Sequence, residues 1–327
     1  MPLTLTVRTE RWPIAGAFNI ARGAKTEAAV VVAELHDGRL RGQGECVPYG
    51  RYGETPEGVA AAIEAMRNAL QGGLDRQGLQ AAMPAGAARN ALDCAFWDLE
   101  SKRSGRPVHT LAGLAAPHAL TTAYTISLGT PEAMGEAAGK AAARKLLKVK
   151  LGGEGDPARI HAVRAAAPQA ELIVDANEAW RADTLLENLA ACAAAGVTLV
   201  EQPLPAGDDA VLATIERPIA VCADESVHDR ESLSGLVGKY DAVNIKLDKT
   251  GGLTEALAMA REAERLGFSL MVGCMVATSL SMAPAVLVAQ RARVVDLDGP
   301  LLLARDRENG LRYAESLVHP PTAALWG

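Results

Sequence analysis

The feature that most constrains the fold is a charged residue at the end of one apolar run after another. The runs are LLKVKLGG, LIVDAN, TLVEQP, AVCADES, VNIKLDKTGG and VVDLDGP, with one uncharged ending, SLMVGCM. Counted from Lys150, with Gly273 for the uncharged ending, the steps are 25, 26, 23, 22, 27 and 23 residues. That interval is the length of one strand, one helix and two loops. Because all strands of a (β/α) barrel end on the same face, the pattern predicts one charged pocket.

Eight apolar runs predict eight parallel strands. They lie near 122–127, 146–151, 171–175, 197–201, 218–223, 242–246, 269–273 and 293–297. Strands that alternate with amphipathic helices are typical of parallel sheets with crossover helices. Eight of them favour a closed barrel over an open sheet, and no G-x-G-x-x-G motif supports a dinucleotide-binding fold.

The residues before about 118 lack this interval and predict a separate α+β unit. Strand-like segments at 3–9, 27–35 and 39–46 precede helical segments near 56–71 and 85–104. We therefore predict an α/β protein with a (β/α)7β TIM-like barrel at 119–299 and an N-terminal α+β capping domain at 1–118. The tail, about 300–327, is expected to complete the capping domain, with the strand-like 310–318 returning to pair with it.

The composition argues against several classes of protein. The net charge is −6 and no basic tract is present, which argues against a nucleic-acid partner. The N-terminus has no apolar core of a signal peptide, and no apolar stretch of about 18 residues occurs. We therefore expect a cytoplasmic protein with no membrane partner, and a homo-oligomer is compatible with the sequence. The five cysteines form no C-x-x-C pattern and are expected to be buried, reduced thiols.

Three successive strand ends carry a carboxylate: Asp175, Glu201 and Asp224. Hard oxygen ligands with no His or Cys among them suit Mg²⁺, which prefers octahedral oxygen coordination. A lone acid at a strand end often only caps the following helix, but three in succession favour a metal site. Asn177 and Gln202 follow two of these acids and are placed to orient or extend the ligand set.

Lysines occupy two further strand ends. Lys148 and Lys150 are one residue apart on a strand, so their side chains point to the same side. Each disfavours the charge of the other, which would lower a pKa toward the range of a general base. Lys246 arises four strands further along and is expected to face Lys150 across the pocket. Lone lysines are usually solvated surface charges, but lysines inside apolar strands are costly to bury without a role.

The last strand end carries Asp296 and Asp298, again spaced to lie on one side. Because three acids already suffice for a metal, we expect this pair to hold another cation, such as a substrate ammonium group. A second metal is the less favoured use. The alternative is a turn before Gly299 and Pro300, for which aspartate is well suited.

These motifs together give the chain a family resemblance. The K-x-K pair with VDAN, EQP, ADES and NIKLDKTGG resembles the enolase superfamily, muconate-lactonizing subgroup, over the whole chain. Within it, the D-x-D of Asp296 and Asp298 resembles the dipeptide epimerases, in which that pair binds the α-ammonium of the dipeptide. The stretches FNIARG, PYGRYGE, PAGAARNALD and VVDLDGP look closest to the L-Ala-D/L-Glu epimerases.

The resemblance implies an isomerase that inverts the α-carbon of the C-terminal residue of a dipeptide by 1,1-proton transfer. The three strand-end carboxylates would hold one Mg²⁺ per subunit, and Lys148 would add a second positive contact to the substrate carboxylate and its enediolate. Lys150 and Lys246 would transfer protons on opposite faces. Arg22, in the capping loop, would receive the side-chain carboxylate of a glutamate, and Thr125 is expected to contact the substrate.

The capping loops near 15–25 and 48–55 are expected to set the substrate. Arg22 favours an acidic second residue, and Arg51 is placed to do the same task. The conformation of such loops does not follow from one sequence, so the two arginines stay alternatives.

Other activities stay open. Cycloisomerisation, o-succinylbenzoate synthesis or N-acylamino acid racemisation would give Asp296 and Asp298 no ammonium to hold. Synthases and acylamino-acid racemases of the subgroup often carry a glutamate after the G-C-M of the seventh strand, where this chain has GCMVAT. A Schiff-base enzyme would use Lys150 or Lys246 as a nucleophile and leave the three carboxylates without a purpose. An inactive metal-binding barrel would turn over no dipeptide.

Overall fold

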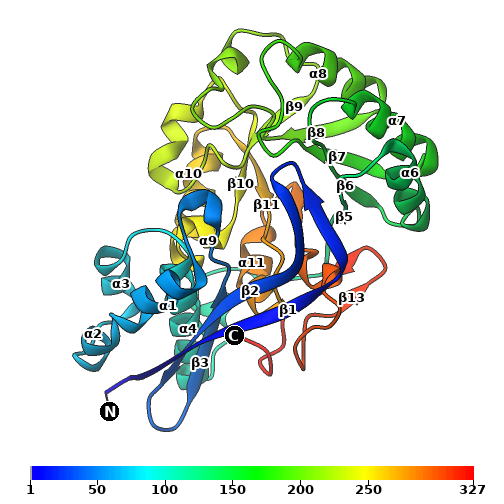
Figure 1. Cartoon of the computed structure of the whole chain (residues 1–327). Helices are drawn as coiled ribbons and strands as arrows, with labels where there is room; N and C mark the ends of the chain where they lie inside the picture. Colours follow the sequence, from blue (N-terminus) through cyan, green and yellow to red (C-terminus); the bar gives the residue numbers. More distant parts are fainter. Residues whose placement is uncertain (1) are drawn as a thin grey trace.

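The first hundred residues of the computed structural model, which describes residues 2–327, form an antiparallel sheet covered by helices (Figure 1). The strands, in sheet order, are β1 (Thr4–Ile20), β2 (Gly23–His36) and β3 (Arg41–Cys46). The helices are η1 (Gly50–Tyr52), α1 (Pro56–Glu64), α2 (Arg67–Gln71), α3 (Arg76–Ala82), α4 (Ala87–Ser104) and α5 (Val108–Leu111). The predicted α+β unit is therefore present, although the helix expected near 56–71 is divided into α1 and α2.

Two glycines explain how closely this sheet meets its longest helix. A Cβ atom built on Gly42 would lie 2.3 Å from the carbonyl oxygen of Ala95 in α4. One built on Gly44 would lie 2.2 Å from the carbonyl oxygen of Ala91. Any larger residue at either position of β3 would therefore push the strand and the helix apart.

β1 and β2 form a long hairpin that reaches over the barrel strands (Figure 1). The two strands stay paired as far as Ile20 and Gly23, so the expected capping loop at 15–25 is largely a strand hairpin with a tight tip. The pairing shifts register between Pro13 and Phe18. Proline lacks an N–H for the ladder, which makes an irregularity at this point understandable.

Eight parallel strands follow, and neighbours along the chain are neighbours in the sheet. They are β5 (Tyr124–Ile126), β6 (Leu146–Lys150), β7 (Glu171–Asp175), β8 (Val197–Glu201), β9 (Ala220–Ala223), β10 (Ala242–Ile245), β11 (Ser269–Val272) and β12 (Val294–Val295). Each predicted apolar run contains one of them. The N–H of Ala123 donates to the carbonyl of Val295 at 2.8 Å, which joins the two ends of the curled sheet. The predicted barrel fold is confirmed.

Helical segments connect these strands along the outside of the sheet (Figure 1). They are α6 (Pro131–Lys140), α7 (Asp156–Ala166), α8 (Leu185–Ala194), η2 (Ala210–Ala213), η3 (Arg230–Leu236), α9 (Leu247–Thr250), α10 (Leu253–Arg265), α11 (Ser279–Ala289) and, after β12, η4 (Gly299–Leu302). The expected alternation with amphipathic helices is wrong after β8 and β9, where only the short 3₁₀ helices η2 and η3 occur. Pro203 and Pro205 precede η2 and lack the N–H groups that a longer helix needs. Within residues 2–327, no helix is long and apolar enough to cross a membrane.

One apolar side chain from each barrel strand, or from the residue before it, makes a floor inside the barrel. The eight are Ala123, Leu146, Ile173, Leu199, Cys222, Ala242, Met271 and Val294. Side chains alternate along a strand, so residues two positions further face the same interior. Those residues are Thr125, Lys148, Asp175, Glu201, Asp224, Asn244, Gly273 and Asp296. A polar layer therefore lies directly above the apolar floor.

The C-terminal tail pairs with the N-terminal unit through Leu303, which forms an antiparallel bridge with Ile14 of β1, and not through 310–318. A third small sheet has the order β13 (Tyr313–Ala314), β14 (Leu317–Val318), β4 (Leu120–Thr121). The prediction that 310–318 pairs with the N-terminal unit is wrong, because the hydrogen bonds of β14 go to β13 and to β4. The last residues do reach that unit: the Trp326 indole donates to the carbonyl of Cys94 at 3.0 Å.

Candidate active site

The polar layer above the barrel floor holds most of the predicted site residues. Asp175, Glu201 and Asp224 are 0%, 0% and 2% exposed. Lys148 Nζ lies 2.6 Å from Glu201 Oε2 and 3.1 Å from Asp175 Oδ2. Lys150 Nζ lies 2.6 Å from the same Asp175 oxygen. The structure thus brings carboxylates and lysines of successive strands into direct contact.

Lys246 approaches the carboxylates from another side of the barrel. It follows β10, which is separated from β6 by β7, β8 and β9. Its Nζ lies 2.6 Å from Asp224 Oδ2 and 3.9 Å from Glu201 Oε1. Lys150 and Lys246 both line one cavity of about 690 Å³. The two lysines therefore face one cavity from different strands, as the sequence predicted.

The carboxylates keep these lysines charged. Burial lowers the pKa of Lys148, but attraction from Asp296 and then from two further carboxylates outweighs it and raises the pKa well above the ordinary value. In Lys246, burial is likewise outweighed by Asp224 and Glu201, and the pKa is raised. The prediction that neighbouring lysines depress a pKa is therefore wrong for Lys148, because the surrounding acids outweigh one like charge.

The strand ends carry buried oxygens that lack donors. Among the described residues, five buried side-chain oxygens have no hydrogen-bond partner, and all belong to this layer or lie within two residues of it along the chain: Asn177 Oδ1, Glu201 Oε2, Glu225 Oε2, Asn244 Oδ1 and Asp296 Oδ1. Glu201 Oε2 is near the Lys148 ammonium but out of line for a hydrogen bond. A buried oxygen without a partner costs about 1–3 kcal/mol, so such a cluster in one place favours a bound cation or polar ligand.

Lysine side chains lie between the three predicted metal ligands. In the part of the chain that the structure describes, no three His, Cys, Asp or Glu side chains are grouped as a ready-made metal site. Lysine ammonium groups instead lie between the carboxylates: Lys148 bridges Asp175 and Glu201, and Lys246 lies between Glu201 and Asp224. Each neighbouring pair of acids therefore already shares one cation. Because all the donors are oxygens, the set fits Mg²⁺, which would take over these contacts.

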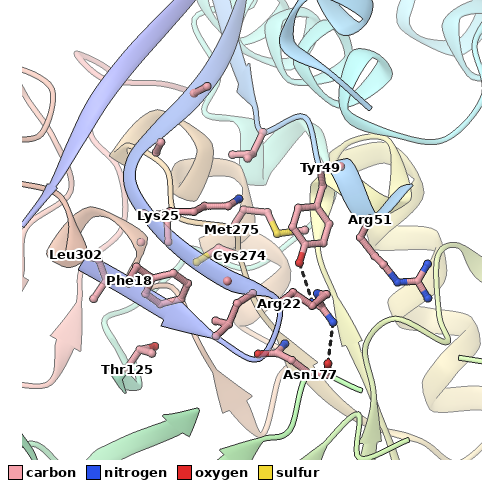
Figure 2. A pocket seen from close by; sticks show the side chains of 18 of the residues that line it. Phe18, Arg22, Lys25, Tyr49, Arg51, Thr125, Asn177, Cys274, Met275 and Leu302 are labelled. Atoms are coloured by element: carbon pink, nitrogen blue, oxygen red, sulfur yellow. Dashed lines mark hydrogen bonds between the residues drawn. The ribbon is translucent and has the colours of Figure 1, made fainter. Parts of the chain in front are cut away.

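Asp296 and Asp298 follow β12 and line the same cavity. Asp296 Oδ2 accepts from Lys148 Nζ at 2.7 Å, and Asp298 Oδ2 accepts from the Thr125 N–H at 2.7 Å. Burial, and then repulsion from Asp296, raises the pKa of Asp298 to about 7. Thr125, a predicted substrate contact, also lines the cavity (Figure 2). Two buried acids beside one lysine leave negative charge for a cationic ligand.

Arg22 stands at the tip of the β1–β2 hairpin and reaches the barrel strand ends (Figure 2). Its guanidinium donates to Glu225 Oε1 at 2.5 Å, to the Tyr49 hydroxyl at 2.8 Å and to the Asn177 carbonyl at 2.8 Å. Asn177 has a φ of 46°, a left-handed conformation that is uncommon outside glycine and found at functional sites. The predicted substrate arginine thus also holds the hairpin on the barrel.

Two further cations line the cavity from the N-terminal unit (Figure 2). Arg51 makes a two-point ion pair with Glu178, at 2.8 and 2.9 Å. Lys25 lies 5.3 Å from the centre of the Tyr49 ring, and it pairs with no carboxylate in the described residues. Burial, and then repulsion from Arg22, lowers the pKa of Lys25. Lys25 therefore carries a positive charge at the cavity that no carboxylate of the described residues neutralises.

Three charged residues in or beside the site were not predicted from the sequence. Lys25 follows Arg22 by three positions, and Glu225 directly follows Asp224. Lys249 lies three positions after Lys246, and its Nζ is 2.5 Å from Asp224 Oδ1. The available signal was position along the chain alone, since each is a charged residue within three positions of a predicted site residue.

Comparison with known proteins gives the family. The model described as "Mandelate racemase / muconate lactonizing enzyme, N-terminal domain" matches residues 3–113. The model described as "Enolase C-terminal domain-like" matches residues 133–324. The chain belongs to the mandelate racemase/muconate lactonizing enzyme family of the enolase superfamily. The resemblance stated from the strand-end motifs is confirmed.

Relatives within this family match nine tenths or more of the chain. The L-Ala-D/L-Glu epimerase of Escherichia coli strain K12 is 48% identical over 318 residues, 97% of this chain and 99% of that protein. The N-acetyl-D-glutamate racemase of Pseudoalteromonas sp. is 46% identical over 302 residues, 91% and 95% of the two chains. The structure of an enolase family member from Agrobacterium tumefaciens, with homology to dipeptide epimerases and with bound sodium and L-Ala-L-Glu, has a TM-score of 0.98 at 57% identity, covering 100% of both chains.

Proposed function

We propose that the chain is a Mg²⁺-dependent dipeptide epimerase that interconverts L-Ala-L-Glu and L-Ala-D-Glu by 1,1-proton transfer. One observation carries this proposal: Lys150 and Lys246 face one cavity from β6 and β10, four strands apart in an eight-stranded barrel. Two such groups can remove a proton from one face of a carbon and return one to the other face, which inverts it. The similarity to an L-Ala-D/L-Glu epimerase at 48% identity supports the same reaction.

The chemical difficulty is the negative charge that develops when the α-proton of a carboxylate is removed. Asp175, Glu201 and Asp224 would hold Mg²⁺, which would supply positive charge against this developing negative charge. Lys148 would supply a second positive charge from the polar layer above the apolar floor. Its raised pKa, which is unsuited to a base, suits this role because the group must stay protonated.

Lys150 and Lys246 serve in turn as base and acid, and exchange roles when the substrate has the opposite configuration. A base must be neutral, whereas Asp224 and Glu201 hold Lys246 charged in this structure. Neutralisation of these acids by a bound cation would remove most of that attraction. We therefore infer that the base strength of Lys246 depends on occupancy of the metal site.

Asp296 and Asp298 favour a dipeptide over an N-acylated amino acid. The free α-ammonium of a dipeptide would pair with their buried charge, whereas an N-acetyl group carries no positive charge. N-acylamino acid racemisation is the second candidate, because an N-acetyl-D-glutamate racemase is 46% identical to the chain. The two candidates differ in what the aspartate pair contacts.

A substrate screen in D₂O tests the proposal. The purified protein with Mg²⁺ is incubated with L-Ala-L-Glu, with a panel of other dipeptides and with N-acetylglutamate. Mass spectrometry measures deuterium at the α-carbon, and chiral chromatography measures the epimers. We expect deuterium in the glutamate residue together with inversion, and no reaction of N-acetylglutamate. Turnover of N-acetylglutamate alone would identify a racemase, and turnover of no compound would reject both candidates.

The hairpin cations are expected to set the preference for an acidic second residue. The Arg22 guanidinium and the Lys25 ammonium lie 5.9 and 5.3 Å from the centre of the Tyr49 ring. We expect Lys25→Met to lower kcat/KM for L-Ala-L-Glu about 10- to 100-fold and to leave L-Ala-L-Ala nearly unchanged, because a hydrogen bond to a charged group contributes about 1.5–3 kcal/mol. Arg22→Met should lower both, since it also loses its contact with Glu225. An equal loss on both dipeptides for Lys25→Met would contradict its role in specificity.

Activity is expected to fall in acid through Asp298. Its pKa of about 7 means that it takes up a proton below that pH and loses the charge that attracts the substrate ammonium. At saturating Mg²⁺, kcat/KM, which reports the free enzyme, should therefore decline below about pH 7. The decline in kcat should lie at lower pH, because a bound ammonium favours the charged carboxylate. Coincident profiles would argue against Asp298 as the titrating group.

A further inference from the structure

Lys249 is a buried lysine that the proposed reaction does not use. Its side chain is 1% exposed, and it is not among the cavity-lining residues of the described chain. Its Nζ donates to Asp224 Oδ1 at 2.5 Å, to the Asp224 carbonyl at 2.6 Å and to the Asn244 carbonyl at 3.0 Å. An ammonium group has three protons, and all three are used. Lys249 therefore has no proton to offer a substrate.

The two carboxylate oxygens of Asp224 have separate surroundings. Oδ2 lies 2.6 Å from Nζ of Lys246, which lines the cavity. Oδ1 is occupied by Lys249. The backbone is fixed as well, because the Asp224 N–H donates to Gln202 Oε1 at 2.8 Å. Gln202 itself has a φ of 32°, a left-handed conformation that is uncommon outside glycine.

We infer that Lys249 makes Asp224 a one-oxygen ligand and thereby makes the metal site selective for Mg²⁺ over Ca²⁺. Mg²⁺ takes six oxygens at short distances, whereas Ca²⁺ takes six to eight and readily accepts both oxygens of one carboxylate. With Oδ1 bound to Lys249, Asp224 offers Oδ2 alone. That restriction removes a contact that Ca²⁺ would gain and Mg²⁺ does not need. The inference rests on the metal site of the proposed function.

Metal titrations of the metal-free protein test this inference. Isothermal titration calorimetry gives Kd for Mg²⁺ and for Ca²⁺ in the wild type, in Lys249→Met and in Lys102→Met. The last variant is a matched control, because Lys102 pairs at 2.7 Å with the buried Asp98 in the N-terminal unit. Loss of a nearby positive charge strengthens the binding of both ions to a similar extent, so the ratio of the two Kd values is the readout.

We expect Lys249→Met to shift the ratio of the two Kd values toward Ca²⁺ about tenfold. Loss of a residue that holds a metal ligand in place typically changes metal affinity by about this factor. Lys102→Met should leave the ratio unchanged. An unchanged ratio in Lys249→Met would overturn the inference while leaving the proposed epimerase intact. Failure of the wild type to bind either ion would reject both the inference and the metal site.

The wild type also gives a direct test, which decides the matter if Lys249→Met does not fold. In crystals soaked separately with Mg²⁺ and Ca²⁺, Asp224 should bind each ion through one oxygen. The other oxygen should stay within hydrogen-bond distance of Lys249 Nζ. Two-oxygen binding by Asp224 in either crystal would overturn the inference.

Discussion

Lys246→Ala is expected to stop epimerisation but to keep deuterium exchange of one substrate isomer. With a single remaining base, Lys150, the enzyme can still remove and return a proton on one face of the α-carbon. Loss of a general acid or base typically lowers the rate about 10²–10⁴-fold, so inversion should become undetectable or nearly so. L-Ala-L-Glu and L-Ala-D-Glu are incubated separately in D₂O, and mass spectrometry and chiral chromatography are followed over time.

Lys150→Ala is the mirror-image experiment. It should also stop inversion, and it should exchange the isomer that Lys246→Ala does not. Lys140→Ala is the control, because Lys140 is an exposed lysine in a surface pair with Glu136. That variant should behave as the wild type. If both active-site variants epimerise normally, or if both exchange the same isomer, the two-base assignment is wrong.

The strand-end residues could be predicted because two simple regularities fix where they lie. Alternation along a strand places Lys148 two positions beyond the floor residue Leu146, and Asp175 two positions beyond Ile173. The common direction of barrel strands then brings all such positions to one face. Both regularities are properties of the chain itself, so the fold class and the polar layer followed without a structure.

Contacts between distant segments could not be predicted in this way. The Arg22–Glu225 ion pair joins residues 203 positions apart and depends on β1 and β2 continuing well beyond the strand-like segments 3–9 and 27–35. The charge state of Lys148 depends on Asp296, 148 positions away. The spacing of Lys148 and Lys150 predicts a lowered lysine pKa because the sequence does not show which acids surround them in space. In the structure, the acids around Lys148 raise its pKa. The local sequence pattern therefore predicted where the site residues lie, whereas their charge states and ion pairs depend on contacts between distant segments.

Chelation of the metal is expected to abolish epimerisation without unfolding the protein. The loss should be about 10³-fold or more, because a bound cation contributes several kcal/mol of charge stabilisation in such a reaction. The fold should persist because Lys148 and Lys246 already lie within 2.6–3.1 Å of Asp175, Glu201 and Asp224. Activity is measured after EDTA treatment and after return of Mg²⁺, and circular dichroism with thermal melting follows the fold. Full activity in EDTA would contradict a metal-dependent reaction.

Lys148→Met is expected to make the stability of the protein depend on the metal. Lys148 contacts Asp175, Glu201 and Asp296, so its removal leaves buried carboxylates with too little positive charge. Removing one partner of a buried ion pair typically lowers the free energy of unfolding by about 3–5 kcal/mol. Mg²⁺ would restore part of the missing charge, and a ligand that binds only the folded state stabilises it. The rise in Tm on adding Mg²⁺ should therefore be larger in Lys148→Met than in the wild type. An equal rise in both proteins would show that lysine and metal do not share the same carboxylates.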